Sequence, residues 1–405
     1  MGHGTPTAGR VFLPRVGFTP QPLVGTANRR GLFGTLLLVA GKGHGIHALR
    51  SGGSDLMKNA QIDVPRLVRM KDGALQRLGL YLARSRLTPA ALLHSEGMLP
   101  SILDTARQSL RDYGIAAALV SEVNEASVEE AARLRSAVPS SCKALIGLGG
   151  GKALDIAKYT ASLAELPYFA VPTSLSNDGF CSPQASLTSG GKRQSVSTGP
   201  PEAVVVDLAV CQQAPRPLWH SGVGDLCSKF TAVSDWKLAF YRRGEPVNDL
   251  AALISDASVF QFMANPVSDR EGIRLLATAL MLNGVAMEIA GSSRPASGSE
   301  HLISHALDMM EASPRLHGLQ TGTAAYLVSS LQHGNHHEKI GELFARTGFW
   351  ESVRKQPFSK EEWRIAVERA PSVKEDFYTI LSERDAWPEF ARMIAHDPAL
   401  VGCFE

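Results

Sequence analysis

The stretch that decides the fold of this chain is Ala144-Leu-Ile-Gly-Leu-Gly-Gly-Gly-Lys-Ala-Leu-Asp155. Residues 144–148 are mostly apolar, as in a buried strand, and a helical pattern of apolar residues begins at Lys152. The three consecutive glycines between them let the backbone approach a pyrophosphate without a Cβ in the way, and the helix start offers free N–H groups to its negative charge. The stretch therefore predicts a strand, a phosphate-binding turn and a helix.

Two familiar glycine motifs do not fit this turn. A P-loop would need glycine instead of Ile146 and Ser or Thr instead of Ala153, and a G-x-G-x-x-G fingerprint that began at Gly149 would need glycine instead of Leu154. A tight structural turn is the alternative to a nucleotide site. The loop over 171–183, which is either a ligand loop or a polar surface loop, favours the nucleotide site. It places hydroxyls and a carboxylate at the carboxyl end of a strand, where ligands of open α/β sheets bind.

On both sides of this turn, strands alternate with helices of about ten residues or more. Such alternation is typical of parallel βαβ units, so we expect residues 61–208 to form a doubly wound α/β dinucleotide-binding domain. The expected strands are 65–70, 90–93, 116–120, 144–148, 168–171 and 204–208, and the expected helices are 74–84, 99–113, 127–137 and 152–163.

Helical periodicity dominates from Cys211 onward, with breaks at prolines and glycines and no convincing strand. We therefore expect residues 209–405 to form a second, all-helical domain. The cleft between the two domains is where a ligand site is expected.

The composition is that of a folded globular protein of two or three domains. The chain has 405 residues, of which 44% are hydrophobic and 20% charged, and no uninterrupted apolar run approaches the roughly 20 residues of a membrane span. The five cysteines are widely spread without a C-x-x-C pair, which argues against a disulfide framework and favours a reducing cytoplasm. The net charge of +2 gives no indication of a nucleic-acid or anionic membrane partner.

The charge is unevenly distributed along the chain. Residues 1–54 contain six basic residues, no acidic residue and 12 of the 37 glycines, which leaves 35 basic and 39 acidic residues for the remainder. We expect residues 1–60 to be a flexible basic extension, because no helix or strand period is sustained there. The alternative is an export signal at Arg29-Arg30, but Lys42 closes the apolar stretch that follows and no small-residue cleavage site comes after it.

Histidines and an aspartate form a candidate metal site. His301 and His305 are four residues apart and share one face of a helix, and His317 is close enough in sequence to fold back onto them. The segment Gly222-Val-Gly-Asp225-Leu-Cys-Ser-Lys229 supplies a carboxylate near a helix start. A catalytic zinc-type site needs about three such ligands and an open position.

Other interpretations of these histidines stay open. Leu302 stands where a zinc protease needs Glu, so an H-E-x-x-H site is excluded. The three histidines could also be ordinary polar or capping residues. His333, His336 and His337 form a second cluster, which we interpret as a solvated helix end because no carboxylate motif accompanies it.

Taken in order, these motifs resemble the sn-glycerol-1-phosphate dehydrogenase family, within the superfamily of iron-containing alcohol dehydrogenases and dehydroquinate synthase-like enzymes. The resemblance runs from about Val64 to the C-terminal region and leaves the extension without a counterpart. The residues that carry it are Gly149-Gly150-Gly151-x-x-x-Asp155, Pro172-Thr173 to Pro183, Gly224-Asp225-x-x-Ser228-Lys229, Ser299-Glu300-His301-x-x-x-His305 and His317-Gly318.

The resemblance implies a role for individual residues. Asp225, His301 and His317 would bind the metal, normally Zn²⁺, although Ni²⁺ or Fe²⁺ occurs among relatives. Asp178 and His305 would contact the substrate and act in catalysis, with Asp225 close to it. The cofactor NAD or NADP would be held at its pyrophosphate by Gly149, Gly150, Gly151, Lys152, Ala153, Leu154 and Asp155 and at its nicotinamide side by Thr173, Ser176 and Ser182.

The implied activity is reversible NAD(P)-dependent reduction of dihydroxyacetone phosphate to sn-glycerol 1-phosphate, or the same reaction on a related small polyol or ketone. The alternatives are a dehydroquinate synthase-like cyclase that uses NAD transiently and a non-catalytic nucleotide-binding protein. We also expect a cytoplasmic homo-oligomer with no nucleic-acid partner and no membrane span.

Details of the sequence leave the substrate and the cofactor open. Asn177 stands where the family pattern suggests His, and Leu319 stands where a polar or acidic residue is common. Lys229 or Arg294 could bind a substrate phosphate. The segment His94-Ser95-Glu96, where the acidic partner of the cofactor ribose is expected, does not decide between NAD and NADP.

Overall fold

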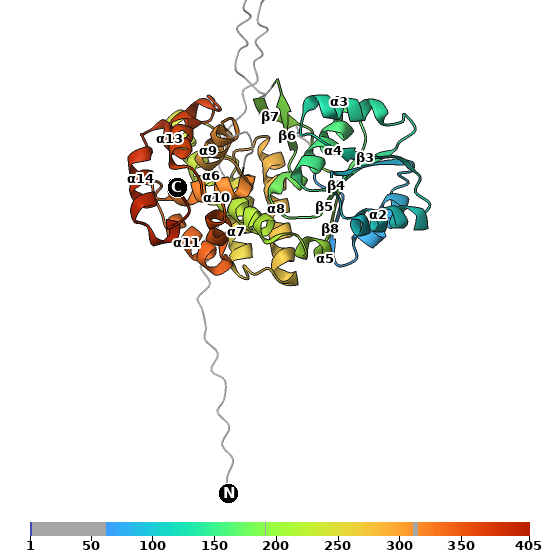
Figure 1. Cartoon of the computed structure of the whole chain (residues 1–405), viewed down its shortest axis with the longest axis horizontal. Helices are drawn as coiled ribbons and strands as arrows, with labels where there is room; N and C mark the ends of the chain where they lie inside the picture. The colour runs from blue at the N-terminus through green and yellow to red at the C-terminus, as the bar shows by residue number, and fades with distance from the viewer. Residues whose placement is uncertain (2–61, 191, 311–314) are drawn as a thin grey trace, which may run out of the picture. The chain divides into compact units, whose positions relative to one another are not determined.

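The computed structural model describes Met1 and residues 62–190, 192–310 and 315–405 (Figure 1). Apart from Met1, the predicted extension over 1–60, with Arg29-Arg30, lies outside the described residues. Ala60–Glu405 forms one compact unit. The fold of this unit is described below.

A six-stranded sheet of parallel strands forms the first part of this unit. Its order is β1-β8-β5-β4-β2-β3, and each neighbouring pair is parallel. The strand order reverses between β2 and β4, so the carboxyl ends of these strands flank the switch point at which ligands of open α/β sheets bind. The strands are β1 (Leu67–Lys71), β2 (Ala90–Ser95), β3 (Ala117–Val123), β4 (Ala144–Gly149), β5 (Tyr168–Pro172) and β8 (Ala203–Asp207).

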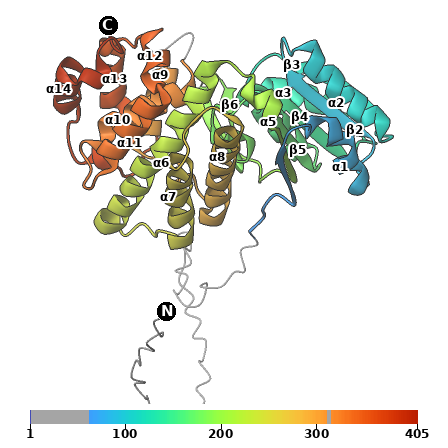
Figure 2. The same cartoon turned by 90° about the horizontal axis from the view of Figure 1, so that it is seen from below.

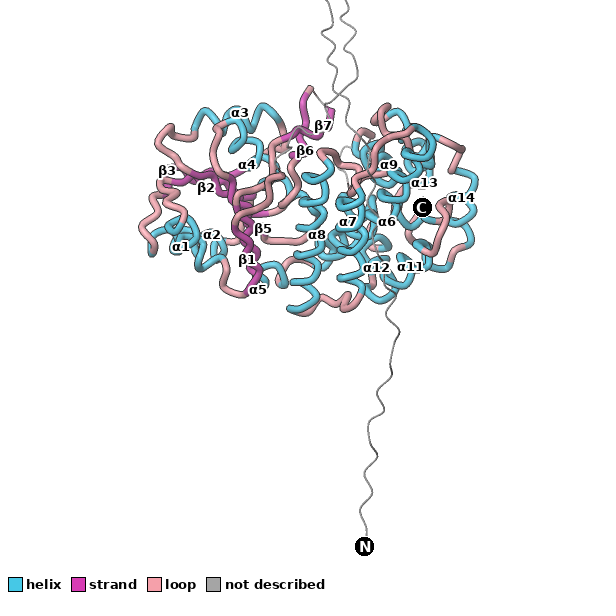
Figure 3. The backbone as a smooth tube through the Cα atoms, turned by 180° about the vertical axis from the view of Figure 1, so that it is seen from behind, coloured by secondary structure: helices cyan, strands magenta, loops and turns pink. Residues whose placement is uncertain are grey.

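Helices cover both faces of the sheet (Figure 3). The side chains of β4 alternate between two hydrophobic clusters, because Ile146 and Leu148 pack with residues of α1 and α2, whereas Leu145 packs with residues of α3 and α4. This arrangement confirms the predicted doubly wound α/β fold. The helices are η1 (Leu75–Arg77), α1 (Leu78–Arg84), α2 (Pro100–Asp112), α3 (Val128–Ala137) and α4 (Gly151–Leu163), and η2 (Asp178–Phe180) follows β5.

A hairpin that the sequence analysis did not predict follows the loop after β5. Strands β6 (Gln184–Ser189) and β7 (Lys192–Ser197) pair antiparallel as a separate two-stranded sheet. The local signal is short but present, since Ala185 and Leu187 are buried and alternate with polar residues. Such a period-2 segment of six residues is easily taken for a polar loop.

From Leu208 to the end, the described residues form helices and no named strand, which confirms the predicted helical region. Helices α6, α7 and α8 lie side by side (Figure 2). The α-helices are α5 (Leu208–Gln212), α6 (Arg216–Arg243), α7 (Asp249–Met263), α8 (Arg270–Ala290), α9 (Ser299–Asp308), α10 (His317–Ser329), α11 (His336–Thr347), α12 (Phe349–Arg354), α13 (Lys360–Arg369) and α14 (Trp387–His396). The 3₁₀ helices are η3 (Ala370–Ser372), η4 (Ile380–Ser382) and η5 (Pro398–Leu400).

Helix α8 is the one described helix that is long and apolar enough to cross a membrane. Half of its most apolar window is buried, and the helix packs against α7, α5 and η2. The core helix of a globular protein passes the same test of length and composition. Its apolar residues therefore serve packing between the sheet and the other helices.

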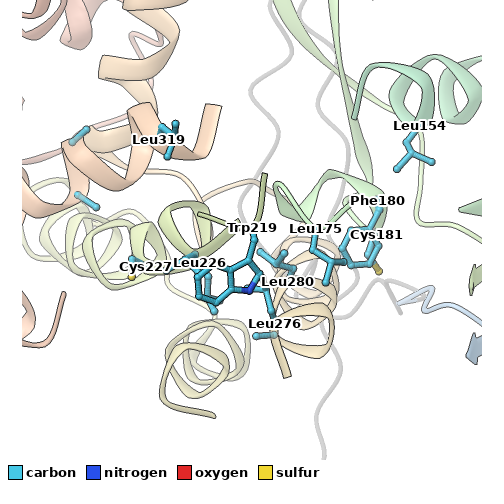
Figure 4. Close-up of a cluster of buried hydrophobic side chains, with 14 of the residues drawn as sticks. Leu154, Leu175, Phe180, Cys181, Trp219, Leu226, Cys227, Leu276, Leu280 and Leu319 are labelled. Carbon is cyan, nitrogen blue, oxygen red and sulfur yellow. The ribbon is translucent and has the colours of Figure 1, made fainter. Parts of the chain in front are cut away.

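One hydrophobic cluster joins the sheet and the helical region. It contains Leu175 and Phe180 from the loop after β5 together with Trp219 of α6 and Leu276 and Leu280 of α8 (Figure 4). All five cysteines are free and buried. Because packing is continuous across residue 208, the division into domains 61–208 and 209–405 stays a prediction.

Candidate active site

Three predicted metal ligands converge from three different helices. Asp225 lies on α6, His301 lies on α9, and His317 is the first residue of α10. Their ligand atoms all lie within 4.8 Å of one another. His301 Nε2 is 3.6 Å from Asp225 Oδ1, and the ring centroids of His301 and His317 are 5.0 Å apart. The structure therefore brings together the ligand set that the sequence suggested.

Glycines bring α6 and α10 close enough to form this triad. A Cβ on Gly318 would lie 1.8 Å from the carbonyl oxygen of Ser221, and one on Gly224 would lie 2.0 Å from the carbonyl oxygen of Gly318. Any side chain at these positions would push the two helices apart. Asp225 follows Gly224 and His317 precedes Gly318, so the same contact places the two ligands side by side.

Neighbouring groups fix the orientation of both imidazoles. His301 Nδ1 is 2.9 Å from Glu300 Oε1, and His317 Nδ1 is 3.1 Å from Ser304 Oγ, whose hydroxyl donates to Gln320 Oε1 at 2.8 Å. Both Nδ1 atoms are assigned as donors on this network, which leaves both Nε2 atoms as electron-pair donors.

This donor set fits a divalent metal ion. Nε2 of His301 and Oδ1 of Asp225 face each other across 3.6 Å. Burial lowers the pKa of His301, but hydrogen bonds to Asp225 and Glu300 outweigh it and raise that pKa above its usual value. A proton on Nε2 satisfies this contact when no metal is bound, and a metal ion would take its place between the two atoms. Two imidazoles with one carboxylate are the ligands that Zn²⁺ and Fe²⁺ accept.

A buried lysine lies against the site carboxylates. Lys229 Nζ is 3.1 Å from Asp225 Oδ1 and 2.9 Å from Asp178 Oδ2. Burial lowers the pKa of Lys229, but the two carboxylates outweigh it and raise that pKa. Burial also raises the pKa of Asp225, yet Lys229 and His301 hold it below its usual range. The prediction that Lys229 binds a substrate phosphate is therefore wrong, because its ammonium group is enclosed by carboxylates.

A cavity of about 120 Å³ opens over the triad. Asp178, His301, His305 and His317 line it, and the backbone N–H of Asp178 donates to Asp225 Oδ2 at 2.9 Å. The ring of His305 lies 6.3 Å from that of His301 and 6.1 Å from that of His317, measured between centroids. Both residues that were expected to contact a substrate therefore face the space next to the metal ligands.

The glycine turn lies at the switch point of the sheet. Gly149 has φ +145°, and a Cβ there would lie 2.1 Å from Ser95 Oγ. The N–H of Gly150 donates to Ser95 Oγ at 3.1 Å, and the N–H of Thr173 donates to the carbonyl of Gly149 at 3.0 Å. A Cβ on Gly150 would meet nothing within 4 Å, and no side chain caps α4. The turn therefore leaves open space in front of a helix start, which fits a pyrophosphate.

The residues after the turn contribute in different ways. Ala153 and Leu154 are buried in the core, so only their backbone can face a phosphate. Lys152 Nζ donates to the carbonyl of Asn124 at 2.8 Å and lies 3.5 Å from Glu96 Oε2. Lys152 therefore lies between the ends of β2 and β3, at the edge of the predicted cofactor site.

Asp155 lies one turn into α4 and anchors the hairpin. Its Oδ2 accepts from the N–H of Ser186 at 3.3 Å, and its Oδ1 is 3.4 Å from Lys158 Nζ. Lys158 donates further to the carbonyls of Gly179 and Gln184 at 2.6 and 2.7 Å. These bonds hold α4, η2 and β6 together, so Asp155 positions the loop that carries Asp178.

The loop after β5 connects the glycine turn with the triad. Asn177 and Ser182 line the cavity, and Asn177 Nδ2 lies 3.4 Å from the Cβ position of Gly151. The carbonyl of Ser176 accepts from Ser221 Oγ at 2.8 Å, which fixes the loop to α6. The nicotinamide roles of Thr173, Ser176 and Ser182 stay predictions, and their positions lie between the two halves of the site.

Two other expectations change. Arg294 is not available to a phosphate, because its Nε donates to Glu245 Oε1 at 2.7 Å and its Nη1 to the carbonyl of Tyr378 at 3.0 Å, and the residue is 2% exposed. Leu319 is buried in the hydrophobic cluster seen in Figure 4, so it serves packing.

The second histidine cluster is only partly solvated. His333 is exposed, whereas His336 stacks on Phe230 with ring centroids 4.6 Å apart. His337 Nδ1 lies 3.0 Å from the carbonyl of Tyr326. His336 and His337 therefore pack against other residues at the start of α11. The prediction that this cluster is a solvated helix end is confirmed only for His333.

Comparisons with known proteins agree with this geometry. A sequence model described as iron-containing alcohol dehydrogenase matches residues 69–215. The glycerol-1-phosphate dehydrogenase [NAD(P)+] of Aeropyrum pernix is 34% identical over 348 residues, which cover 84% of this chain and 98% of that protein. The protein of the same name from Metallosphaera sedula is 32% identical, with 84% and 98% covered. This chain belongs to the glycerol-1-phosphate dehydrogenase family.

Solved structures support the fold of this family member. Glycerol dehydrogenase from Schizosaccharomyces pombe has a TM-score of 0.66 at 19% identity and covers 86% of this chain and 92% of that one. An iron-containing alcohol dehydrogenase from Thermotoga maritima has a TM-score of 0.59 at 17% identity, with 83% and 99% covered. The resemblance inferred from the motifs is therefore confirmed at the level of the family and of the fold.

Proposed function

We propose that this chain catalyses the reversible reduction of dihydroxyacetone phosphate by NAD(P)H and a proton to sn-glycerol 1-phosphate and NAD(P)⁺. The observation that carries the proposal is the cavity over the Asp225, His301 and His317 triad, which is lined by Asn177, the neighbour of Gly151 in the glycine turn. A nicotinamide cofactor and a ketone substrate need two neighbouring sites of this kind. The names of the relatives favour the phosphorylated substrate.

Different residues of the chain would bind the metal ion, the substrate and the cofactor. Asp225, His301 and His317 would hold the ion, and Glu300 and Ser304 keep the two imidazoles in the required tautomer. We favour Zn²⁺, because a set of two imidazoles and one carboxylate with an open position is typical of catalytic zinc. A bound Zn²⁺ supplies Lewis acidity that polarises a carbonyl or lowers the pKa of an alcohol.

Asp178 and His305 complete the substrate side. Their side chains line the cavity beside the triad, where the Asp178 carboxylate can accept a hydrogen bond from a substrate hydroxyl and the His305 imidazole can accept or donate one. His305 is placed to pass a proton between the substrate oxygen and solvent. The free N–H groups at the start of α4, from Gly151 and Lys152, would orient the cofactor at its pyrophosphate, and a bound nicotinamide would supply the hydride chemistry. Burial of Asp225 and Lys229 excludes water from beneath the ligands.

An assay of cofactor oxidation tests the proposal. The zinc-loaded protein is given NADH or NADPH with dihydroxyacetone phosphate, and the glycerol phosphate formed is assigned as the sn-1 or sn-3 isomer by enantioselective analysis. We expect one NAD(P)H to be consumed for each sn-glycerol 1-phosphate formed. A cyclase would show no net NADH consumption, and the absence of turnover in a folded, zinc-loaded sample would contradict the proposal. The expected homo-oligomer and cytoplasmic location stay predictions.

A further inference from the structure

Two cations that the sequence analysis did not single out face the cavity over the triad. Arg193 lies on β7, and Lys374 lies just after η3, about 180 residues further along the chain. Both line the cavity that also contains His301, His305 and His317. Both also line an adjoining hollow with Ser195 and His305. Distant segments of the chain thus bring two positive charges to the cavity and hollow that His305 also lines.

These charges are only weakly neutralised by the described residues. The nearest carboxylate to Arg193 is that of Asp308, whose Oδ2 is 3.9 Å from Nη1, and the side chain of Arg193 is 40% exposed. Lys374 makes no ion pair within 4.0 Å among the described residues, and its Nζ lies 4.6 Å from the centre of the Phe377 ring. Burial lowers the pKa of Lys374 below its usual value, because it outweighs the carboxylate of Asp376, which raises that pKa, and Arg294 adds a smaller lowering. An ammonium group in such a place is stabilised by an anionic ligand.

The hydroxyl groups of Ser186 and Ser195 line the same two cavities as Arg193. Arg193 and Ser195 are two residues apart on β7 and therefore point to the same face, and Ser195 pairs with Ser186 across the hairpin. Arg193 Nε donates to Ser186 Oγ at 2.7 Å, which orients the guanidinium group. Among the described residues, no hydrogen bond occupies its Nη1 and Nη2 groups, which can make a planar, two-pronged contact with an oxyanion.

Asp178 also lines this cavity and lies next to Asp225 and Lys229. Apart from histidines, Arg193 and Lys374 are the basic residues of its lining. A small molecule with its carbonyl at the triad is therefore oriented with a dianionic end toward Arg193 and Lys374. The glycine turn is a different anion site, since it lies at the ends of β2 and β4.

We infer that Arg193 and Lys374, with the hydroxyl of Ser195, bind the phosphate group of a small phosphorylated ketone or alcohol whose reacting carbon lies at the triad. This assignment rests on the proposed function, to which it adds the residues that select a phosphorylated substrate. The phosphate-binding role predicted for Lys229 or Arg294 is thus assigned to Arg193 and Lys374. Lys229 and Arg294 already form ion pairs with Asp225 and Glu245.

The test compares a phosphorylated and an unphosphorylated substrate. In Arg193→Gln and Lys374→Gln, kcat/KM for dihydroxyacetone phosphate is expected to fall about 10- to 100-fold each, as when a charge-assisted hydrogen bond is lost. With dihydroxyacetone as substrate, kcat/KM is expected to stay within about twofold of the wild type, because no phosphate is present. Arg193→Lys and Lys374→Arg should recover part of the loss, since they keep the charge. Lys143→Gln, an exposed site at the amino end of β4, is the matched control.

A binding measurement keeps this test separate from the proposed function. The zinc-loaded proteins are titrated with inorganic phosphate in a calorimeter. We expect the wild type to bind phosphate and the double variant Arg193→Gln/Lys374→Gln to bind it at least tenfold more weakly. Melting temperatures of both proteins are compared to exclude unfolding. Suppose the wild type turns over dihydroxyacetone phosphate, but in the variants kcat/KM falls equally for both substrates or falls for neither. The phosphate assignment is then overturned while the proposed function stands. If the wild type turns over neither substrate, the proposed function fails, and phosphate binding alone decides the assignment.

Discussion

His301 and His305 differ only in what surrounds them, although they lie on one face of α9. His301 Nδ1 is held by Glu300 and its Nε2 faces Asp225 at 3.6 Å. His305 lies one turn later, where burial and the imidazoles of His317 and His301 lower its pKa. One imidazole is thus oriented as a ligand and the other is left for the substrate.

Loss of a ligand imidazole should remove the metal. In His301→Ala, we expect bound zinc to fall from about one per chain to well below half and turnover to fall by at least about 100-fold, because a two-ligand site binds weakly. Metal analysis after dialysis and the NAD(P)H assay measure the two effects. The exposed His333→Ala is the matched control and should keep its zinc and its activity. Full metal content in His301→Ala would contradict the assignment.

Glu96 is the residue that bears on the choice between NAD and NADP. It follows β2, beside the glycine turn, and its carboxylate is 3.5 Å from Lys152 Nζ. An acidic side chain at this place suits a ribose 2′-hydroxyl and repels a 2′-phosphate.

Removal of that charge should shift the cofactor preference toward NADPH. In Glu96→Gln, the ratio of kcat/KM for NADPH to that for NADH is expected to rise roughly tenfold, or about 1.4 kcal/mol, because Lys152 becomes free to meet the 2′-phosphate. Steady-state kinetics with both cofactors measures the ratio. Glu165→Gln, at the far end of α4, is the control. An unchanged ratio would show that Glu96 does not face the ribose.

The contact between α6 and α10 is the element-scale feature on which the site depends. It joins residues about 95 positions apart and is closed by Gly224, Gly318 and Gly322, whose absent side chains let the backbones touch. The predicted motifs contain two of these glycines next to Asp225 and His317. Their role in helix packing is visible only once the two helices are placed together.

A methyl group in this contact should weaken both packing and metal binding. Gly318→Ala is expected to lower the free energy of unfolding by about 1–3 kcal/mol through overpacking and to weaken zinc binding at least about tenfold, since Asp225 and His317 move apart. Chemical denaturation and zinc titration with a competing chelator measure the effects. Gly341→Ala is the control, because Gly341 lies inside α11 and its new Cβ would be in ordinary contact, 3.4 Å from the ring of Tyr326. Alanine favours a helix over glycine, so the free energy of unfolding should be unchanged or rise by up to about 1 kcal/mol. Equal behaviour of the two variants would contradict this role.

At the scale of the whole molecule, buried titratable groups tie distant elements together. His220 of α6 is fully buried, with Nδ1 2.6 Å from Ser352 Oγ and Nε2 3.1 Å from the carbonyl of Thr347. Burial lowers its pKa from 6.5 to about 4. The unfolded chain therefore binds more protons than the folded chain between these two pH values.

This difference predicts a loss of stability in mild acid. The stabilising contribution of neutral His220 is complete above about pH 6.5 and is lost as the pH falls from 6.5 toward 4. In His220→Gln, we expect lower stability at pH 7.5 but a smaller fall between pH 7 and pH 5, because Gln does not titrate. Denaturation curves with EDTA present measure the difference without a contribution from metal binding. The control His333→Gln should follow the wild type, and parallel curves for His220→Gln would contradict the prediction.

The net charge of the whole molecule does not explain how the site attracts anions. The residues after the N-terminal 54 carry 35 basic and 39 acidic side chains, yet the cavity must hold an anionic cofactor and an anionic substrate. Attraction therefore depends on local placement of glycine N–H groups and of Arg193 and Lys374 rather than on net charge.

The parallel α/β order and the glycine turn at 149–151 were predictable from the sequence alone, because each rests on local periodicity or on a short spacing. Spacing also made His301, His305, His317 and Asp225 candidates for a metal site, and the family resemblance selected Asp225, His301 and His317 among them. Only the tertiary structure decided which charges are free. Lys229 pairs with the buried Asp225 and with Asp178, and the buried Arg294 pairs with the partly buried Glu245. Arg193 and Lys374 instead reach the cavity from a hairpin and a turn with no strong local signal. The physical reason is that burial and ion pairing depend on contacts between segments far apart in the chain, and a local pattern carries no information about them.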